Sequence, residues 1–311
     1  MYAPICLFTY NRLIETRITL EYLQSNYLFD KSKLFIFCDG AKDEMDLQKT
    51  KALRKYLHGL KNIINLQIIE KDKNNGLAKS IISGVTKVID VYSKVIVIED
   101  DLKTSNNFLK FMNDSLTIFE KELRIASISG YSIPIKLPKD YKFQTYFVKR
   151  PFSWGWATWK NRWQEVNWDI MTYEKYLINK EIIRKFKKIG SDLPPALTKL
   201  FNGKTDSWYI LWAFYHFINK KLSVYPTSSK ILNLGFGGSG VHCQSINLFA
   251  TNIDASNDLS FLFNTNINEQ KYFDKCYYNI FSKKNKILQR LKLFKNFEGI
   301  NLLVKDIKSR L

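Results

Sequence analysis

Short hydrophobic runs alternate with longer amphipathic segments over the first 130 residues. Nearly apolar runs, typical of strands buried on both faces of a sheet, lie at 4–10, 33–38, 63–69, 95–98 and 125–129. The segments between them predict helices at about 11–25, 43–60, 77–92 and 106–120. Asn11 is the expected N-cap of the first helix. Strands and helices in repeated short units predict an α/β fold, with a mostly parallel sheet flanked by helices.

The second half of the chain is rich in tryptophan. Five of the seven tryptophans lie between residues 150 and 168. Trp159 and Trp163 are four residues apart on a predicted helix, which favours a core position. Trp154 and Trp156 flank Gly155, and we expect them to stack on sugar rings of an acceptor.

A helix at about 206–219 and a glycine-rich loop at 235–240 follow the tryptophan-rich segment. The chain contains no internal repeat and no long linker. It therefore predicts one domain over residues 1–282, with a nucleotide-binding half at 1–130 and an acceptor-binding half at 131–282. Residues 283–311 form a C-terminal appendage.

Positive charge is concentrated in this appendage. The chain has 48 Lys and Arg against 29 Asp and Glu, a net charge of +19. Nine of these basic residues lie in 283–311, beside only Glu298 and Asp306. Apolar residues recur there at helical spacing, which predicts a basic amphipathic helix suited to an anionic membrane surface. The alternative is a helix docked on the body with its lysines in water.

Other composition features narrow the setting. No apolar run approaches the ~18 residues of a spanning helix, and four scattered cysteines lack metal-ligand spacing. No nucleic-acid-binding motif is present, so nucleic acid is not an expected partner. Together with a start that lacks a basic and apolar leader, these features predict a cytoplasmic protein, peripheral on the inner face of the inner membrane.

Polar residues follow the predicted strands where ligands bind in parallel sheets. Glu99, Asp100 and Asp101 come directly after the run at 95–98. Three acids after a buried strand favour a hard cation such as Mg²⁺ or Mn²⁺ carrying a diphosphate. The alternative is a solvated loop or a helix N-cap. Asp39 fits a hydrogen bond from a nucleobase N–H or an ordinary Asp-Gly turn, and Arg12 fits a phosphate, a base or a solvated helix start.

Several of these segments resemble a known fold family. The segments, which cover roughly residues 3 to 245, lie at 5–12, 37–40, 75–77, 97–101, 154–156, 205–208 and 237–242. In order and composition they resemble the glycosyltransferase A (GT-A) fold. Within this fold family, they resemble more specifically the inverting N-acetylglucosaminyltransferase I-like enzymes and bacterial polysaccharide and lipopolysaccharide sugar transferases. The resemblance implies a Rossmann-like nucleotide-sugar-binding sheet.

The resemblance also implies roles for individual residues at the donor. Arg12 and Asp39 match positions that bind uridine, and Asn75 lies in a matching turn of the donor site. Asp101 matches the metal-binding acid, with Glu99 and Asp100 toward the sugar and ribose of the donor.

Two further matches concern the base and the glycine-rich loop. The family's base is an aspartate in an acidic pair before a tryptophan; here Asp206 is the one acid, and strict alignment places Ser207 at the base position. Asp206 also fits a plain helix N-cap. His242 ends a glycine-rich stretch that resembles a loop over the donor.

The expected function is therefore a metal-dependent inverting glycosyltransferase. It moves a sugar from a nucleotide-sugar, with a UDP-sugar expected, to a hydroxyl of a saccharide or lipid-linked saccharide in bacterial surface glycan synthesis. A sugar-nucleotidyltransferase is the first alternative, although the position after the first strand lacks the glycines of its phosphate loop. The second is a non-enzymatic basic protein that binds membrane or nucleic acid.

Overall fold

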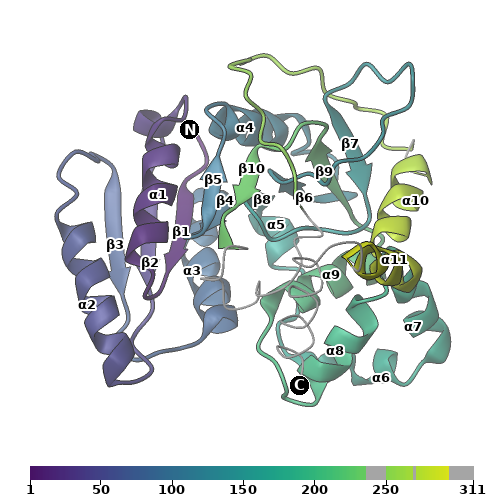
Figure 1. Ribbon diagram of the computed structural model, residues 1–311, viewed down its shortest axis with the longest axis horizontal. Helices are drawn as coiled ribbons and strands as arrows, with labels where there is room; N and C mark the ends of the chain where they lie inside the picture. The colour runs from purple at the N-terminus through teal and green to yellow at the C-terminus, as the bar shows by residue number, and fades with distance from the viewer. Residues whose placement is uncertain (236–249, 269–270, 294–311) are drawn as a thin grey trace.

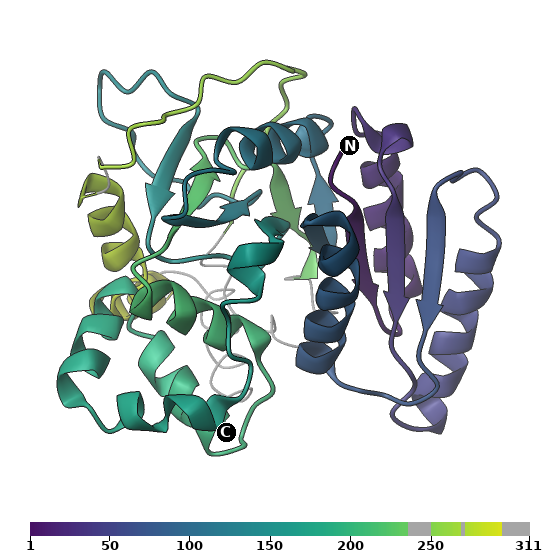
Figure 2. The same cartoon turned by 180° about the vertical axis from the view of Figure 1, so that it is seen from behind.

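The computed structural model describes residues 1–235, 250–268 and 271–293, and its centre is one eight-stranded sheet (Figure 1, Figure 2). The strand order is β3-β2-β1-β4-β8-β6-β9-β7. The strands are β1 Ile5–Thr9, β2 Leu34–Cys38, β3 Leu66–Glu70, β4 Lys94–Glu99, β6 Ile125–Ser129, β7 Thr145–Val148, β8 Trp156–Trp159 and β9 Leu222–Pro226. A mixed, mostly parallel sheet flanked by helices confirms the predicted fold class.

Strands β3, β2, β1 and β4 are parallel and connected by helices, which are α1 Leu13–Gln24, α2 Glu44–His58 and α3 Leu77–Tyr92. Strand β8 lies antiparallel between β4 and β6, so a segment of the second half joins the two parts of the sheet. Strand β9 is parallel to β6, and β7 is antiparallel to β9 at the far edge.

Alternate side chains of the strands pack into two separate cores. Ile5 and Leu7 of β1 point to the face covered by α1, α2 and α4 (Phe108–Ile118). Cys6 and Phe8 point to the opposite face, against α3 and the tryptophans of the second half. Because both faces are covered, β1 and β2 are buried at every position, which explains their uninterrupted hydrophobic runs, whereas β3 at the edge exposes Gln67 and Glu70.

The structure reproduces the predicted helices closely and corrects the start of the first one. Helix α3 spans the same residues, 77–92, as the sequence predicts. The N-cap of α1 is Arg12, which makes no side-chain capping bond. Asn11 does not cap this helix because its side-chain amide donates to Asp46 Oδ1, 2.7 Å away.

Tryptophans of the second half pack into both cores, Trp159 on the α4 face and Trp163 on the α3 face. Trp159 and Trp163 are only 2% and 1% exposed, which confirms their predicted core position. Trp159 is not helical, however. It ends β8 and precedes the short helix α5 (Lys160–Trp163).

Short helices complete the second half. They are η2 Ile170–Tyr173, α6 Glu174–Leu177, α7 Lys180–Phe186, η3 Lys187–Ile189, α8 Leu193–Phe201 and α9 Trp208–Ile218. Helix α9 is buried on nearly every side, between the tryptophan core and a third cluster formed with α7 and α8. A second, two-stranded sheet pairs β5 (Leu102–Thr104) with β10 (Ile231–Asn233) antiparallel.

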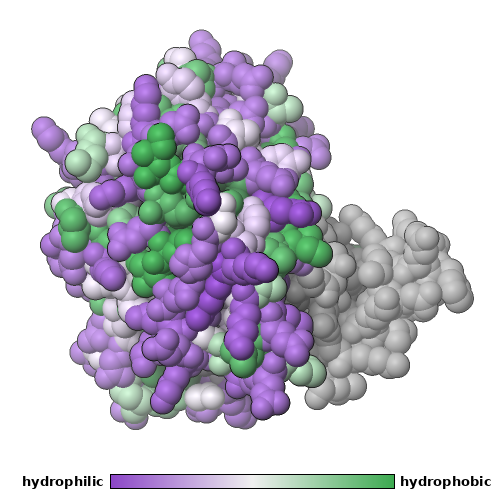
Figure 3. Space-filling model, turned by 90° about the vertical axis from the view of Figure 1, so that its left-hand side faces the viewer, coloured by the Kyte–Doolittle hydropathy of each residue, from purple (hydrophilic) through white to green (hydrophobic). Residues whose placement is uncertain are grey.

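Helix α2 and the edge strand β3 form one outer side of the molecule. Figure 3 shows mainly hydrophilic side chains on this side, with separate hydrophobic spots between them. Glu70 of the edge strand β3 is exposed, and a charged side chain on an edge strand discourages pairing with another sheet. At the other end, α10 (Lys271–Ile280) and α11 (Lys283–Leu293) close the described chain. None of the helices in the described ranges is long and apolar enough to cross a membrane.

Candidate active site at the carboxyl ends of β1 and β4

The connections of the sheet reverse direction beside β1. From β1 the chain moves outward to β2 and β3, and then returns through α3 to β4 on the other side of β1. In open α/β sheets, such a reversal leaves a crevice outside the carboxyl ends of the two strands, where ligands bind. Arg12 follows β1 there and Glu99 ends β4, so the sequence-predicted residues lie at this point.

Arg12 holds two of the three acids. Its Nη1 lies 3.1 Å from Asp101 Oδ2, and its Nη2 forms a second ion pair with Asp100. Burial opposes the positive charge on Arg12, but the two carboxylates outweigh burial and raise its pKa. The guanidinium thus stays charged at the end of β1.

Three acidic side chains, Glu99, Asp100 and Asp101, lie beside the single cation Arg12. Burial raises the pKa of Glu99 to about 8, and repulsion by Asp101 and Asp100 adds to this effect. Burial also raises the pKa of Asp100 to about 7, against the opposing influence of Arg12. A group of acids held in this way is stabilised by an additional cation.

The fit of a metal ion depends on Asp101. Within residues 1–235, 250–268 and 271–293, no group of three or more His, Cys, Asp or Glu side chains is placed to hold a metal ion. The Asp101 side chain is 13% exposed, whereas that of Asp100 is 3% exposed. The hard oxygens of Asp101 suit Mg²⁺ or Mn²⁺, with further ligands coming from a bound diphosphate.

The small sheet brings a second segment against Asp101. The backbone N–H of Leu234 donates to the Asp101 carbonyl oxygen at 2.8 Å. A Cβ at Gly235 would lie 2.6 Å from Asp101 Oδ2 and 3.1 Å from Asn233 Oδ1, so this position has no room for a side chain. Of the predicted glycine-rich loop only Gly235 is described, and His242 lies outside the described residues.

Asp39 is held by backbone groups after β2. Its carboxylate accepts hydrogen bonds from the backbone N–H groups of Gly40, Asn75 and Gly76 at 3.0–3.1 Å. Asp39 is only 8% exposed. Asp39 therefore fixes the turn before α3. The sequence pattern alone does not distinguish this structural role from nucleobase binding.

The side chain of Asn75 makes no hydrogen bond within the described residues and is half-buried at this edge.

Asp206 reaches the same turn from the second half of the chain. Its Oδ2 accepts from the backbone N–H of Ala78 at 3.3 Å, in the first turn of α3. A helix N-terminus favours a negative charge. The N-cap of the following helix, α9, is Ser207. Asp206 therefore does not cap α9, as a capping residue at this position would, and its carboxylate binds the N-terminus of α3 instead. Asp206 is exposed to solvent and thus accessible to a substrate.

The two candidate acceptor tryptophans differ in position. Trp156 is 1% exposed and stacks between Trp208 and Trp163, with centroids 4.9 and 5.6 Å away. Its ring belongs to the core, and this burial contradicts the expected contact with an acceptor sugar. Trp154 is partly exposed and packs edge-on against Tyr131 and Phe152.

Asp46 is a site residue that sequence reasoning missed. It binds both the Tyr10 hydroxyl and the Asn11 amide, and so fixes the segment between β1 and Arg12. The pKa of Asp46 is lowered, and the hydrogen bond from Tyr10 is the largest cause. The Asp46 carboxylate therefore stays ionised. The available signal was the pair of acids Asp43 and Asp46 at the start of a helix, which also fits ordinary capping.

Comparisons with known proteins give partial structural matches. No family model matches the chain, and no curated protein sequence matches it significantly. S. aureus TarS 1–349 is 12% identical over 76% of this chain and 61% of that chain, with a TM-score of 0.44. GalNAc-T7 with UDP, GalNAc and Mn²⁺ is 9% identical over 75% and 43%, with a TM-score of 0.46.

A mannosyltransferase from Pyrobaculum calidifontis, in complex with GDP-Man and Mn²⁺, is 11% identical over 70% of both chains, with a TM-score of 0.40. The matches to TarS structures span between 25% and 61% of those chains. All these likenesses are partial.

Proposed function

We propose that the chain is a metal-dependent inverting glycosyltransferase that uses a nucleotide-sugar donor, with a UDP-sugar as the expected donor. One observation carries the proposal. Arg12 and the acids Glu99 to Asp101 lie where the strand order reverses, and Asp206 from the other half of the chain reaches the first turn of α3 at the same end of the sheet. This end of the sheet supplies a fixed cation, hard oxygen ligands and an exposed carboxylate, where ligands bind in open α/β sheets.

In this proposal, residues 1–130 bind the donor. Arg12 provides a charged donor for a nucleotide phosphate or base, and its release from Asp100 and Asp101 accompanies binding. Asp39 keeps the turn of Asn75 and Gly76 in place, so that these residues line the nucleotide. Asp101 would hold Mn²⁺ or Mg²⁺, and the ion would supply positive charge for the departing diphosphate.

Asp206 is the proposed base in the transfer step. It takes the proton of the acceptor hydroxyl as the hydroxyl oxygen forms a bond to the anomeric carbon. The bond from that carbon to the diphosphate oxygen breaks, and the leaving diphosphate keeps the electron pair. Attack from the side opposite the leaving group inverts the anomeric configuration. The hydrogen bond from Ala78 orients the carboxylate for this step.

Residues 131–282 bind the acceptor, for which we propose a saccharide or a lipid-linked saccharide in surface glycan synthesis. Trp154 remains a candidate for the acceptor side because it is partly exposed. Helix α11 exposes Ile287, Leu288 and Leu291 beside Lys283 and Lys284. An apolar stripe with basic neighbours suits an anionic membrane surface, which supports peripheral attachment at the inner membrane.

Donor affinity tests the role of Arg12. Titration calorimetry with UDP and Mn²⁺ compares the wild type with Arg12→Gln and with Arg17→Gln, an exposed arginine of α1 paired with Glu21. Loss of a charge-assisted contact predicts about a tenfold to hundredfold weaker binding for Arg12→Gln only. Absence of binding to the wild type, or equal affinity of all three proteins, contradicts the proposal.

A further inference from the structure

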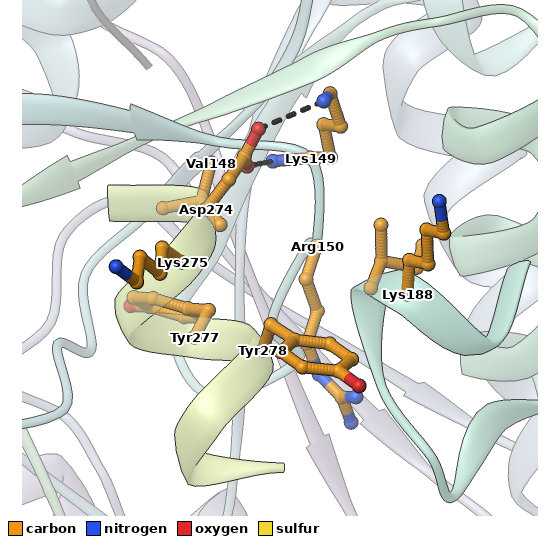
Figure 4. A pocket seen from close by; sticks show the side chains of 9 residues that line it. Val148, Lys149, Arg150, Lys188, Asp274, Lys275, Tyr277 and Tyr278 are labelled. Carbon is orange, nitrogen blue, oxygen red and sulfur yellow. Dashed lines mark hydrogen bonds and ion pairs between the residues drawn. The ribbon is translucent and has the colours of Figure 1, made fainter. Parts of the chain in front are cut away.

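A pocket lies in the other half of the molecule, between the end of β7, the short helix η3 and α10 (Figure 4). Its volume is about 460 Å³, within the usual range of small-molecule sites. None of the residues that line it belongs to the strand-end site. We call it the basic pocket; its charged lining residues are Lys149, Arg150, Lys188, Asp274 and Lys275.

Four of these five side chains are cationic, and only two of the cations have acidic partners. Lys149 Nζ lies 2.9 Å from Asp274 Oδ2, and the Lys149 backbone N–H also donates to this carboxylate. Arg150 is paired with Asp192 through two hydrogen bonds of 3.0 and 2.8 Å. Lys188 and Lys275 form no ion pair within the described part of the chain, so two positive charges remain.

The wall beneath the lysines is rigid. The Arg150 side chain is 5% exposed, and its guanidinium carbon lies 3.6 Å from the centroid of the Phe281 ring. Burial opposes the charge on Arg150, but Asp192 outweighs burial and raises its pKa. Tyr277 is 1% exposed and its hydroxyl bonds that of Tyr146. A fixed wall of this kind reduces the ordering cost of binding.

The two unpaired lysines come from opposite sides of the pocket. Lys188 lies on η3 and Lys275 on α10, with the cavity between these elements (Figure 4). Tyr278, which is 46% exposed, and Ile189 add aromatic and apolar surface. Positive charge on both sides of the opening suits an anionic group with several oxygens, and the apolar surface suits a group attached to it.

We propose that the basic pocket binds a phosphate group carried by a larger molecule. The chemistry is the same for a soluble sugar phosphate and for the headgroup of an anionic lipid. The proposal does not depend on transferase activity, because no residue of the strand-end site takes part. The site would hold such a molecule on the acceptor-binding half of the chain.

Charge removal at the two unpaired lysines tests this proposal. Lys188→Gln/Lys275→Gln is compared with Lys51→Gln/Lys87→Gln, a control that removes the same charge at exposed positions of α2 and α3. Calorimetry with glucose 6-phosphate measures the soluble arm. Flotation with vesicles of phosphatidylcholine containing one quarter phosphatidylglycerol measures the lipid arm. Thermal unfolding verifies that both variants fold.

The expected result is about a tenfold weaker binding of one probe by the pocket variant, with the control variant unchanged. The probe that responds identifies the source of the phosphate group. The proposal is overturned if the wild type binds neither probe. It is also overturned if both variants lose affinity equally, because binding then depends on the overall positive charge and not on this pocket.

Discussion

Removal of the Asp39 carboxylate tests whether this residue braces the turn before α3. The substitution Asp39→Ala deprives the backbone N–H groups of Gly40, Asn75 and Gly76 of their acceptor. Each unsatisfied donor costs about 1 kcal/mol or more, so we expect unfolding free energy to fall by about 3 kcal/mol. Asp39 is nearly buried, so water replaces the carboxylate poorly.

Urea unfolding followed by tryptophan fluorescence measures this change. Asp43→Ala is the matched control, since Asp43 accepts one N–H bond, from Asp46, at the exposed start of α2. Loss of a single N-cap costs about 1 kcal/mol. If Asp39→Ala is no more destabilised than the control, the carboxylate does not brace the turn, and its role is confined to ligand contact.

Three further variants test other parts of the structure. Asp206→Asn is expected to keep UDP affinity by calorimetry while turnover falls by about a hundredfold or more, because the proton acceptor is lost; unchanged turnover would refute the base assignment. Gly76→Ala places a Cβ 2.8 Å from Asp206 Oδ2 at a φ of +80°, so a thermal melt is expected to show a loss of about 1–2 kcal/mol; wild-type stability would argue against that close approach. Burial lowers the pKa of His216 in the folded protein to about 3. Between about pH 6.5 and 3 the His216 imidazole is therefore protonated in the unfolded chain but not in the folded one. The free energy of unfolding falls over this range by about 1.4 kcal/mol for each unit by which the pH falls. His216→Asn is expected to remove this part of the slope in urea unfolding between pH 7 and 5, and identical slopes would show that His216 is already charged in the folded state.

Local patterns predicted the elements of the first half well. The apolar strands are buried on both faces, so the hydrophobic runs marked β1, β2 and β6 to within a residue or two. The row of polar residues at the strand ends followed from this reading, and the structure brings Arg12, Asp100 and Asp101 together.

Partners distant in sequence were beyond such patterns. The contact of Asp206 with Ala78 spans 128 residues, and Asp206 fits an ordinary helix N-cap when considered alone. Trp156 was placed wrongly because a glycine neighbour indicates exposure, whereas pairing of β8 with β4 and β6 buries the ring. The buried pair of Lys230 and Asp254 gave no signal, since Asp254 lies in a segment without periodicity.

Metal-dependent hydrolysis of a panel of nucleotide-sugars tests the central claim most directly. The wild type and Asp101→Asn are incubated with UDP-, GDP- and TDP-sugars, with Mn²⁺ or with a chelator, and nucleotide release is measured. The account predicts that the wild type hydrolyses at least one donor only with the metal, and that Asp101→Asn does not. Hydrolysis that is unaffected by the chelator and by Asp101→Asn, or no hydrolysis of any donor by the wild type, would contradict it.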